Sequence, residues 1–333
     1  MSEKLLTISI AAYNVAQYIE QALDSCLIEK RDLLDVIVVD DGATDSTVSL
    51  VEPYVEKYPE TFRLIRKENG GYGSTVNASL REAQGKYFKL LDGDDWFDFD
   101  GLTQLVDVLE TSDVDLCVTP YLNCYADGQT KKNDQAEPVA EGVHKFNEAR
   151  IPWRISMHSM TYATRILCES GLQLTHHRLY TDTEFINMPL HLVQTVHIMH
   201  TPVYCYRLGR DGQSMSVESL IKNRGDWLAV TQKMIEHFAE RDVRWGTAAH
   251  VNLAWIIDDS IGYMKTLFSM PTSADVWEEI ESFLNYLRSY EDIYRLAVAR
   301  SKWMQLFATT NQYTYPVIAR IFVSGRKLLK KLR

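Results

Sequence analysis

The 333-residue sequence has few of the features that mark secreted, membrane-spanning or nucleic-acid-binding proteins. Its five cysteines are odd in number, widely spread and form no CxxC motif, which argues against a disulfide framework and a zinc ribbon. No apolar run approaches the ~18 residues needed to span a bilayer, and the start of the chain has no signal-peptide pattern. The formal net charge of -10 provides no basic surface for general nucleic-acid binding. We therefore expect a soluble cytoplasmic protein without a nucleic-acid partner.

The composition is that of an ordinary globular protein, with 46% hydrophobic and 24% charged residues. A chain of this length corresponds to about two domains at roughly 100–200 residues each. The glycine-containing segment 209–214 is the expected hinge. The two predicted parts are therefore residues 1–212 and residues 213–333.

Strand-like and helix-like segments alternate over residues 1–118. The run Val36–Val39 is continuously β-branched, as in a strand that is buried on both faces. The expected strands are 5–12, 36–39, 62–66, 87–91 and 115–118, and the expected helices are 16–27, 46–57, 74–83 and one that begins at Asp100. Repeated strand–helix units predict an α/β fold with a mainly parallel sheet flanked by helices.

The pattern changes after residue 118. The polar segment 127–138 is expected to be an exposed loop, and residues 150–210 contain mixed short segments. From about residue 217 the apolar residues recur with helical spacing. We therefore expect a helical C-terminal region after the sheet.

Acidic and aromatic residues follow three of the predicted strands: Tyr13–Asn14, Asp40–Asp41 and Asp92–Asp95. In a sheet of this kind, ligands bind beyond the carboxyl ends of the strands. Carboxylates placed so close together need a cation or hydrogen-bond donors nearby, and oxygen ligands suit Mg²⁺ or Mn²⁺. The alternative is that acidic turn residues only cap the next helix. The second acidic pair and the adjacent Trp96 favour a metal site.

In their order and spacing, several motifs resemble those of the family 2 glycosyltransferases. They are Ile8–Asn14 (ISIAAYN), Val38–Asp45 (VVDDGATD), Asn69–Gly71, Asn77, Ala83–Tyr87 (AQGKY) and Leu91–Trp96 (LDGDDW). The resemblance covers about the first 120 residues. It implies the GT-A fold, with a nucleotide-sugar-binding half (1–120) and an acceptor half (121–212). It also implies inverting transfer from a nucleotide-diphosphate sugar with a divalent metal, Mn²⁺ or Mg²⁺.

The resemblance also implies roles for residues at the strand ends. Tyr13 should stack on the base, Asp41 should accept its imide N–H, and Asp40 should lie beside Asp41. Asp92 should reach the ribose or the metal, and Asp94 should bind the metal that bridges the diphosphate. The full set expected to bind the nucleotide is Ala11, Tyr13, Asn14, Asp40, Asp41, Gly71, Asn77, Asp92 and Gly93, with Asp92 and Asp94 as the metal ligands.

One departure from the family pattern affects base recognition. The chain has Ala11–Ala12 where the family often has a proline and a polar residue. Contacts there would be through the backbone only, so base selectivity should depend more on Asp41. The alternative for Tyr13 is core packing at the end of a strand.

The segment Tyr180–Phe185 supplies a candidate general base. It resembles the family's acidic pair, but the first position is Thr181, so Asp182 carries the role alone. Inverting transfer needs one carboxylate to take the proton of the acceptor hydroxyl. Glu184 is the second candidate. A helix-capping role is the alternative for Asp182, and the two roles are compatible.

Four further residues are expected in the acceptor or diphosphate region. They are Trp96, Glu184, Arg207 and Arg210. A basic loop flanked by glycine can close over a diphosphate, which is the reason for the two arginines; a surface salt bridge is the alternative for either of them. The three histidines His158, His176 and His177 are expected to be structural or acceptor-lining, with metal ligation as the alternative.

The last predicted feature is a basic tail from Tyr315 to Arg333, which has six Lys or Arg residues and no acid. It predicts either attachment to an anionic membrane face or docking on the acidic body. The function expected overall is transfer of a sugar, from a UDP-sugar, to a saccharide or lipid-linked saccharide in bacterial surface polysaccharide synthesis. A sugar nucleotidyltransferase and a non-catalytic nucleotide-sugar-binding protein are the alternatives.

Overall fold

The computed structural model describes residues 3–149, 151, 154–209, 217–240 and 247–310, together with positions 317 and 321. The chain divides into two compact units. The first comprises residues 1–211 with 243–251, and the second comprises residues 212–242 with 252–333. The expected hinge lies outside the described residues beyond Gly209.

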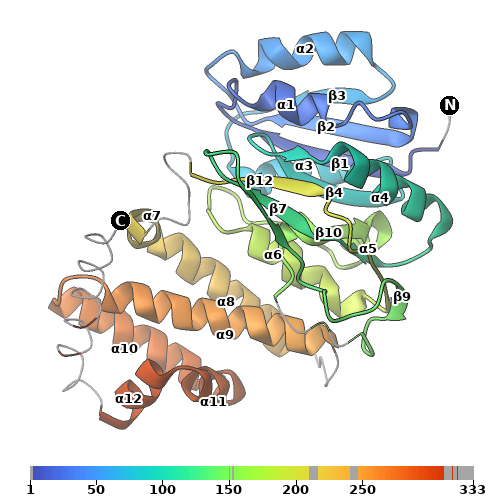
Figure 1. The fold of residues 1–333 in the computed structure, drawn as a ribbon. Coiled ribbons are helices and arrows are strands. Elements are labelled where there is room, and N and C mark those ends of the chain that lie inside the picture. The colour runs from blue at the N-terminus through green and yellow to red at the C-terminus, as the bar shows by residue number, and fades with distance from the viewer. Residues whose placement is uncertain are drawn as a thin grey trace. The chain divides into compact units, whose positions relative to one another are not determined.

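An eight-stranded sheet forms the centre of the first unit (Figure 1). Its order is β3-β2-β1-β4-β10-β6-β11-β9. The bounds are β1 Leu6–Ala12, β2 Leu34–Asp40, β3 Phe62–Arg66, β4 Tyr87–Asp92, β6 Leu116–Val118, β9 Gly142–Lys145, β10 Met160–Ala163 and β11 Thr195–Ile198. Strands β1 to β4 pair in parallel, as do β6 and β11, whereas β9 and β10 are antiparallel to their neighbours. The predicted α/β fold with a mainly parallel sheet is confirmed.

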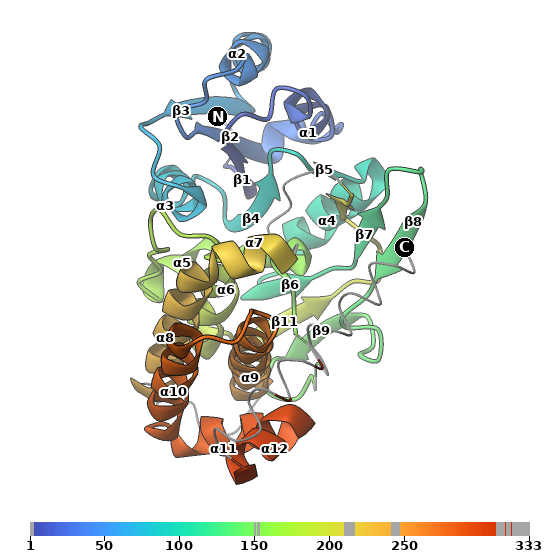
Figure 2. The same cartoon turned by 90° about the vertical axis from the view of Figure 1, so that its left-hand side faces the viewer.

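Helices cover both faces of this sheet, which explains why β2 is buried along its whole length. Figure 2 shows α1 and α4 on one side of the sheet and α3, α5 and α6 on the other. The bounds are α1 Ile19–Asp24, α2 Thr47–Lys57, α3 Tyr72–Glu82, α4 Phe99–Thr111, α5 Thr164–Glu169 and α6 Asp182–Asn187, with short 3-10 helices η1 Arg31–Leu33, η2 Met157–Ser159 and η3 Met188–Leu192. Because β1 to β4 are parallel, their carboxyl ends form one rim.

A second sheet of four short strands has the order β5-β12-β7-β8. The bounds are β5 Trp96–Phe97, β7 Tyr121–Cys124, β8 Thr130–Asn133 and β12 Tyr204–Arg207. The expectation of a loop over 127–138 was wrong for 130–133, because β8 pairs with β7 from Tyr121 to Cys124. Three of the four β8 residues are exposed, so this polar edge strand has no alternating apolar signal.

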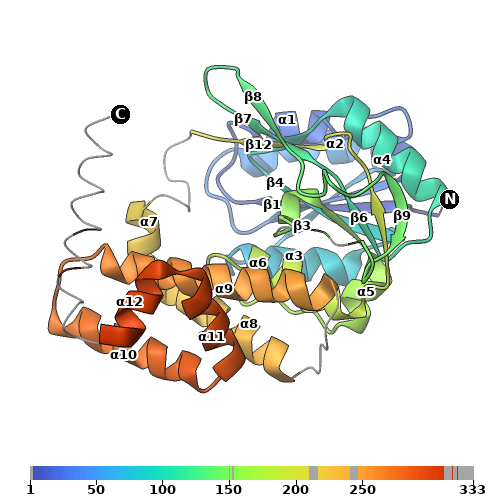
Figure 3. The ribbon, with the colours of Figure 1, turned by 60° about the horizontal axis from the view of Figure 1, so that its bottom comes forward.

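The second unit is helical, as predicted (Figure 3). Its helices are α7 Val217–Lys222, α8 Arg224–Glu240, α9 Thr247–Phe268 from Asn252 onward, α10 Ala274–Arg288, α11 Glu291–Arg300 and α12 Lys302–Thr310. Glu279 of α10 accepts hydrogen bonds from Arg224 of α8 and Tyr263 of α9, which ties three helices together. None of the helices in the described part of the chain is long and apolar enough to cross a bilayer.

Candidate active site at the carboxyl ends of the strands

The loop after β1 is tied to the loop after β2 by Asn14. Its Oδ1 accepts hydrogen bonds from the backbone N–H of Thr44 at 2.8 Å and of Asp45 at 3.3 Å. Asn14 has a φ of 54°, a left-handed conformation that asparagine tolerates better than most residues. The neighbouring Tyr13 is 49% exposed. Its ring therefore lies at the rim and is not part of the core, which removes the core-packing alternative.

The two carboxylates at the end of β2, Asp40 and Asp41, accept hydrogen bonds from the loops around them. Asp40 accepts a hydrogen bond from the N–H of Ala43 at 2.7 Å, which closes the turn after the strand. Asp41 is buried and accepts from Gly70 N at 2.9 Å, Gly71 N at 2.8 Å and Lys67 Nζ at 2.5 Å. Asp41 thus holds the glycine loop against the rim.

The glycine loop is joined in turn to the segment 174–177. Gly71 has a φ of 78°, and a Cβ there would lie 3.1 Å from His177 N, so the position requires glycine. The N–H of His177 donates to Gly70 O at 2.7 Å. The amide of Asn77 donates to Leu174 O at 2.8 Å and accepts from Leu174 N at 2.9 Å. Asn77, which was predicted to bind the nucleotide, therefore forms hydrogen bonds with this segment.

Gly93 and Ala11 meet through their backbones. Gly93 N donates to Ala11 O at 3.1 Å. A Cβ on Gly93 would lie 2.7 Å from the same oxygen, which is closer than a side-chain carbon can approach. This close contact places the end of β4 directly beside the end of β1.

Asp92, the last residue of β4, is the least satisfied carboxylate of the rim. Its Oδ1 is buried and has no hydrogen-bond partner among the residues that the structure describes. Burial raises the pKa of Asp92 well above its usual range, and the charges of Asp95, Asp94 and Asp182 raise it further, against a hydrogen bond with Tyr72. Uncompensated carboxylates of this kind are typical of sites that await a cation or a polar ligand.

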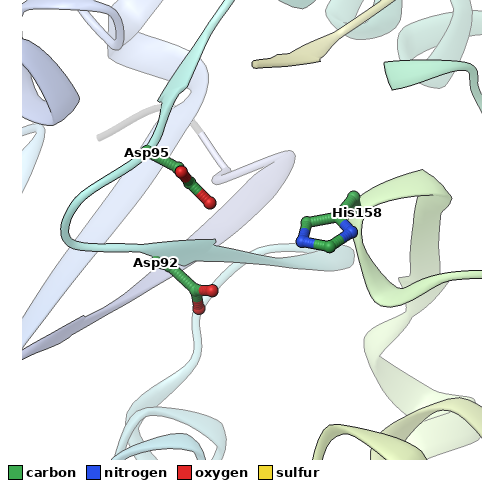
Figure 4. A group of neighbouring side chains, drawn as sticks. All are labelled: Asp92, Asp95 and His158. Atoms are coloured by element: carbon green, nitrogen blue, oxygen red, sulfur yellow. The ribbon is translucent and has the colours of Figure 1, made fainter. Parts of the chain in front are cut away.

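Asp95 and His158 face Asp92 across the site (Figure 4). One ligand atom from each of the three residues lies within 4.8 Å of the others. Asp95 is oriented by two donors, Tyr204 Oη at 2.7 Å and Arg207 N at 2.8 Å. Burial lowers the pKa of His158 to about 3, with a further contribution from Lys89, so the imidazole is neutral.

Asp94 is buried, and its backbone oxygen accepts from Arg207 Nε at 2.8 Å. It does not belong to the group formed by Asp92, Asp95 and His158. The Arg207 guanidinium lies 4.8 Å from the ring centroid of Tyr18 and 4.6 Å from that of Trp96. These contacts hold Arg207 at the rim, stacked between two rings. Arg210 lies outside the described residues.

Asp182 is the first residue of α6, and burial raises its pKa. Its charge also contributes to the raised pKa values of Tyr72 and Asp92. Glu184, two residues later, is fully buried and accepts from Thr175 N at 2.8 Å and Thr175 Oγ1 at 2.7 Å. Glu184 therefore holds the segment 174–177, and Asp182 is left as the carboxylate of this helix that belongs to the site.

Comparison with known proteins identifies the family. Residues 7–170 match the family described as Glycosyl transferase family 2. Through this region the chain belongs to that family. The family 2 match spans β1 to α5 and so includes the whole rim up to β10.

Relatives of this family 2 glycosyltransferase include EpsH of Bacillus subtilis (strain 168), which is 27% identical over 221 residues, 62% of each chain. Hyaluronan synthase of Pasteurella multocida is 26% identical over 241 residues, 69% of this chain and 23% of that protein. The chain spans 62%, 32% and 40% of three curated relatives that it matches. The crystal structure of S. aureus TarS 1–349 is 20% identical, covers 96% of this chain and 88% of that one, and has a TM-score of 0.64. It shares the fold, as does its complex with UDP-GlcNAc, with a TM-score of 0.56.

The donor set at the end of β4 fits a divalent cation. Asp92 and Asp95 supply the carboxylate oxygens that hard cations prefer, and among the described residues nothing donates a hydrogen bond to the buried Asp92 Oδ1, where a cation could bind. All of these candidate ligands are residues of this chain.

Sequence reasoning missed several residues of this family 2 site. Lys67 directly follows β3, so the strand-end rule that found Asp41 could also have found it. Tyr72, Thr175 and Tyr204 have no comparable signal. They reach the rim from a helix, a loop and the second sheet, and only the fold brings them together.

Proposed function

We propose that this family 2 glycosyltransferase moves a sugar from a nucleotide-diphosphate sugar, a UDP-sugar, to a saccharide or lipid-linked saccharide of a bacterial surface polysaccharide, with inversion at the anomeric carbon. The observation that carries this proposal is the raised pKa of two carboxylates, Asp92 and Asp182, the first of which has one buried oxygen without a hydrogen-bond partner in the described part of the chain. The complex of TarS with UDP-GlcNAc supports the choice of donor.

The nucleotide would lie over the ends of β1 and β2. The exposed Tyr13 ring offers a face on which a base can stack. Asp41 Oδ1 accepts from Lys67, Gly70 and Ser74, whereas Oδ2 accepts from Gly71. Each carboxylate oxygen has about two acceptor positions. One remaining position can accept the imide N–H of uracil. Lys67 and the Gly70–Gly71 amides would keep that carboxylate oriented.

The ribose and diphosphate would lie at the end of β4. Asp92 and Asp94 would hold Mn²⁺ or Mg²⁺, which supplies charge stabilisation to the departing diphosphate when bound. The Arg207 side chain, fixed between Tyr18 and Trp96, keeps the backbone around Asp94 in place through its bond to the Asp94 carbonyl.

Asp182 would be the general base. As the acceptor oxygen bonds to the anomeric carbon, Asp182 takes the hydroxyl proton, and the bond from that carbon to the diphosphate oxygen breaks. A carboxylate with a raised pKa accepts a proton more readily near neutral pH than an ordinary one. Glu184 is a positioning residue in this proposal, because both its oxygens bond Thr175.

Two measurements test the proposal. Release of nucleoside diphosphate from a panel of nucleotide sugars, with Mn²⁺ or Mg²⁺, should identify a donor that is turned over. Calorimetry should show UDP binding more tightly than ADP or GDP, with Tyr13→Ala weakening all three by loss of stacking. Equal affinity for the three nucleotides would contradict the role given to Asp41.

The basic tail would bring the protein to the membrane face where lipid-linked acceptors are found. Most of Tyr315–Arg333 lies outside the described residues, so this part of the proposal rests on sequence. A basic residue near an anionic surface contributes roughly 1 kcal/mol. The full chain should sediment with anionic but not neutral vesicles, whereas a chain that ends near Thr310 should stay in the supernatant. If both stay in the supernatant, the tail has no membrane role.

A further inference from the structure

His158 carries a ring nitrogen that the proposed chemistry does not use. It lies in η2, and its Nδ1 is 2.5 Å from Ser156 Oγ. The ring is packed by three tyrosines, with centroid distances of 5.0 Å to Tyr121, 4.7 Å to Tyr204 and 4.5 Å to Tyr206. Figure 4 shows a ring nitrogen that faces the Asp92 and Asp95 carboxylates. Since Nδ1 is bonded to Ser156, the nitrogen aimed at the carboxylates is Nε2.

We propose that His158 Nε2, Asp92 and Asp95 form a mixed nitrogen–oxygen cation site, which favours Mn²⁺ or Co²⁺ over Mg²⁺. The three ligand atoms lie within 4.8 Å of one another. Ligands on opposite sides of a cation at about 2.1 Å are about 4.2 Å apart, so a small inward movement would give bonding distances. Imidazole nitrogen suits transition metals, whereas Mg²⁺ prefers oxygen ligands.

The surroundings hold the three ligands in place, as the neighbours of ligands do in known metal sites. Ser156 fixes the His158 ring through Nδ1. Lys89, buried in β4, donates to His158 O at 2.9 Å and to Met160 O at 3.3 Å, which fixes η2 itself. Tyr204 orients the Asp95 carboxylate. In the described part of the chain no group donates a hydrogen bond to the buried Asp92 Oδ1, which leaves this oxygen available to coordinate a cation.

This site deepens the proposed function and shares Asp92 with it, but its cation binding can be measured without any sugar transfer. The proposed function uses Asp92 and Asp94, which are oxygen ligands only. Adding His158 changes the preference for the cation. The quantity to measure is therefore the ratio of Co²⁺ to Mg²⁺ affinity, compared between variants, since most protein sites bind Co²⁺ more tightly than lighter divalent ions.

The full-length protein would be titrated with Co²⁺ and Mg²⁺ by calorimetry, with and without UDP. His158→Gln keeps a side chain of similar reach and replaces the ligating nitrogen by an amide oxygen. It should lower the Co²⁺/Mg²⁺ affinity ratio about tenfold or more and alter the visible absorption of bound Co²⁺. Ser156→Ala keeps the nitrogen and only loosens the ring, so it is the matched control, with a smaller fall.

A measurement on the wild type removes dependence on whether a variant folds. Pulsed EPR of the Mn²⁺-loaded protein should show coupling to an imidazole nitrogen. Absence of that coupling, or an unchanged affinity ratio in a folded His158→Gln protein, overturns the site. If Asp94→Asn abolishes cation binding and His158→Gln leaves the affinity ratio unchanged, the cation sits at Asp92 and Asp94, and the inference fails while the proposed function stands. Nitrogen coupling without turnover of any nucleotide sugar supports the site and rejects the proposed function.

Discussion

The carboxylates at the end of β2 and those at the end of β4 have opposite surroundings. Asp41 receives hydrogen bonds from Lys67, Gly70 and Gly71. Asp92 has a buried oxygen without a partner, and the nearest charges are those of other acids. Folding therefore gives one carboxylate several hydrogen-bond donors and leaves the other with a raised pKa.

The contrast separates residues that build the site from residues that act in it. Groups whose hydrogen bonds are complete within the protein hold loops, as Asp41 does for the Gly70–Gly71 loop and Glu184 does for Thr175. Groups with unmet hydrogen bonds are expected to bind a ligand, and they lower the stability of the protein until that ligand binds. Substitutions should therefore divide into those that reduce stability and those that reduce only activity.

The largest effect is expected for Asp182→Asn. A general base contributes typically ~10²- to 10⁴-fold to the rate, so kcat should fall by that factor while the Kd for UDP stays the same. The matched control is Glu184→Gln on the same helix, where the fall in kcat should be much smaller. If Glu184→Gln is the more damaging change, the roles of the two residues are exchanged.

Asp94→Asn should lower the metal-dependent rate by ~100-fold, about 3 kcal/mol of transition-state stabilisation. Loss of one charged ligand weakens the hold on the cation and on the diphosphate. Raising the Mn²⁺ concentration should recover part of the activity, and the midpoint of urea unfolding should stay near that of the wild type. Full activity at ordinary Mn²⁺ concentration would move the cation site away from Asp94.

Asp41→Asn should act on stability. The substitution removes the ionic partner of the partly buried Lys67 ammonium group. It also turns an amide N–H₂ toward the Gly70–Gly71 amides, which are donors themselves. The free energy of unfolding should therefore fall by about 2–3 kcal/mol. Urea denaturation followed by circular dichroism measures the change. An unchanged unfolding midpoint would mean that the hydrogen bonds at the end of β2 contribute little, and the contrast with β4 would be lost.

The sequence predicted the first four strands closely because each is a local apolar run between turn residues. The second sheet was not predicted, since its pairing is between distant segments: Tyr204 of β12 pairs with Tyr121 of β7 and with Phe97 of β5. Polar β8 has no apolar period at all. Pairing over such separations has no signature within either strand.

The site was predicted as a set of strand-end residues, and the structure places Tyr13, Asp41 and Asp92 together at the rim. Their roles as ligand-binding residues remain predictions. The sequence does not show which polar side chains already have their hydrogen bonds within the protein. Asn77 and Glu184 look as polar as Asp92 and Asp182 in the sequence, and only the fold shows that their hydrogen bonds are taken by Leu174 and Thr175.

The smallest effect, and the sharpest test of the contrast, is expected for Asp92→Asn. The folded-state pKa of Asp92 lies above the unfolded value of about 3.9. Well below this value the carboxyl is protonated in both states, so its ionisation does not change the free energy of unfolding. As the pH rises from the unfolded pKa toward the higher folded pKa, the unfolded state ionises first, and stability is lost. The wild type should thus be the less stable protein at neutral pH, by on the order of 1 kcal/mol, and the difference should vanish near pH 4. Urea unfolding of both proteins from pH 4 to 8 measures it, and an Asp92→Asn protein that is less stable at pH 7 would show that Asp92 is satisfied within the fold.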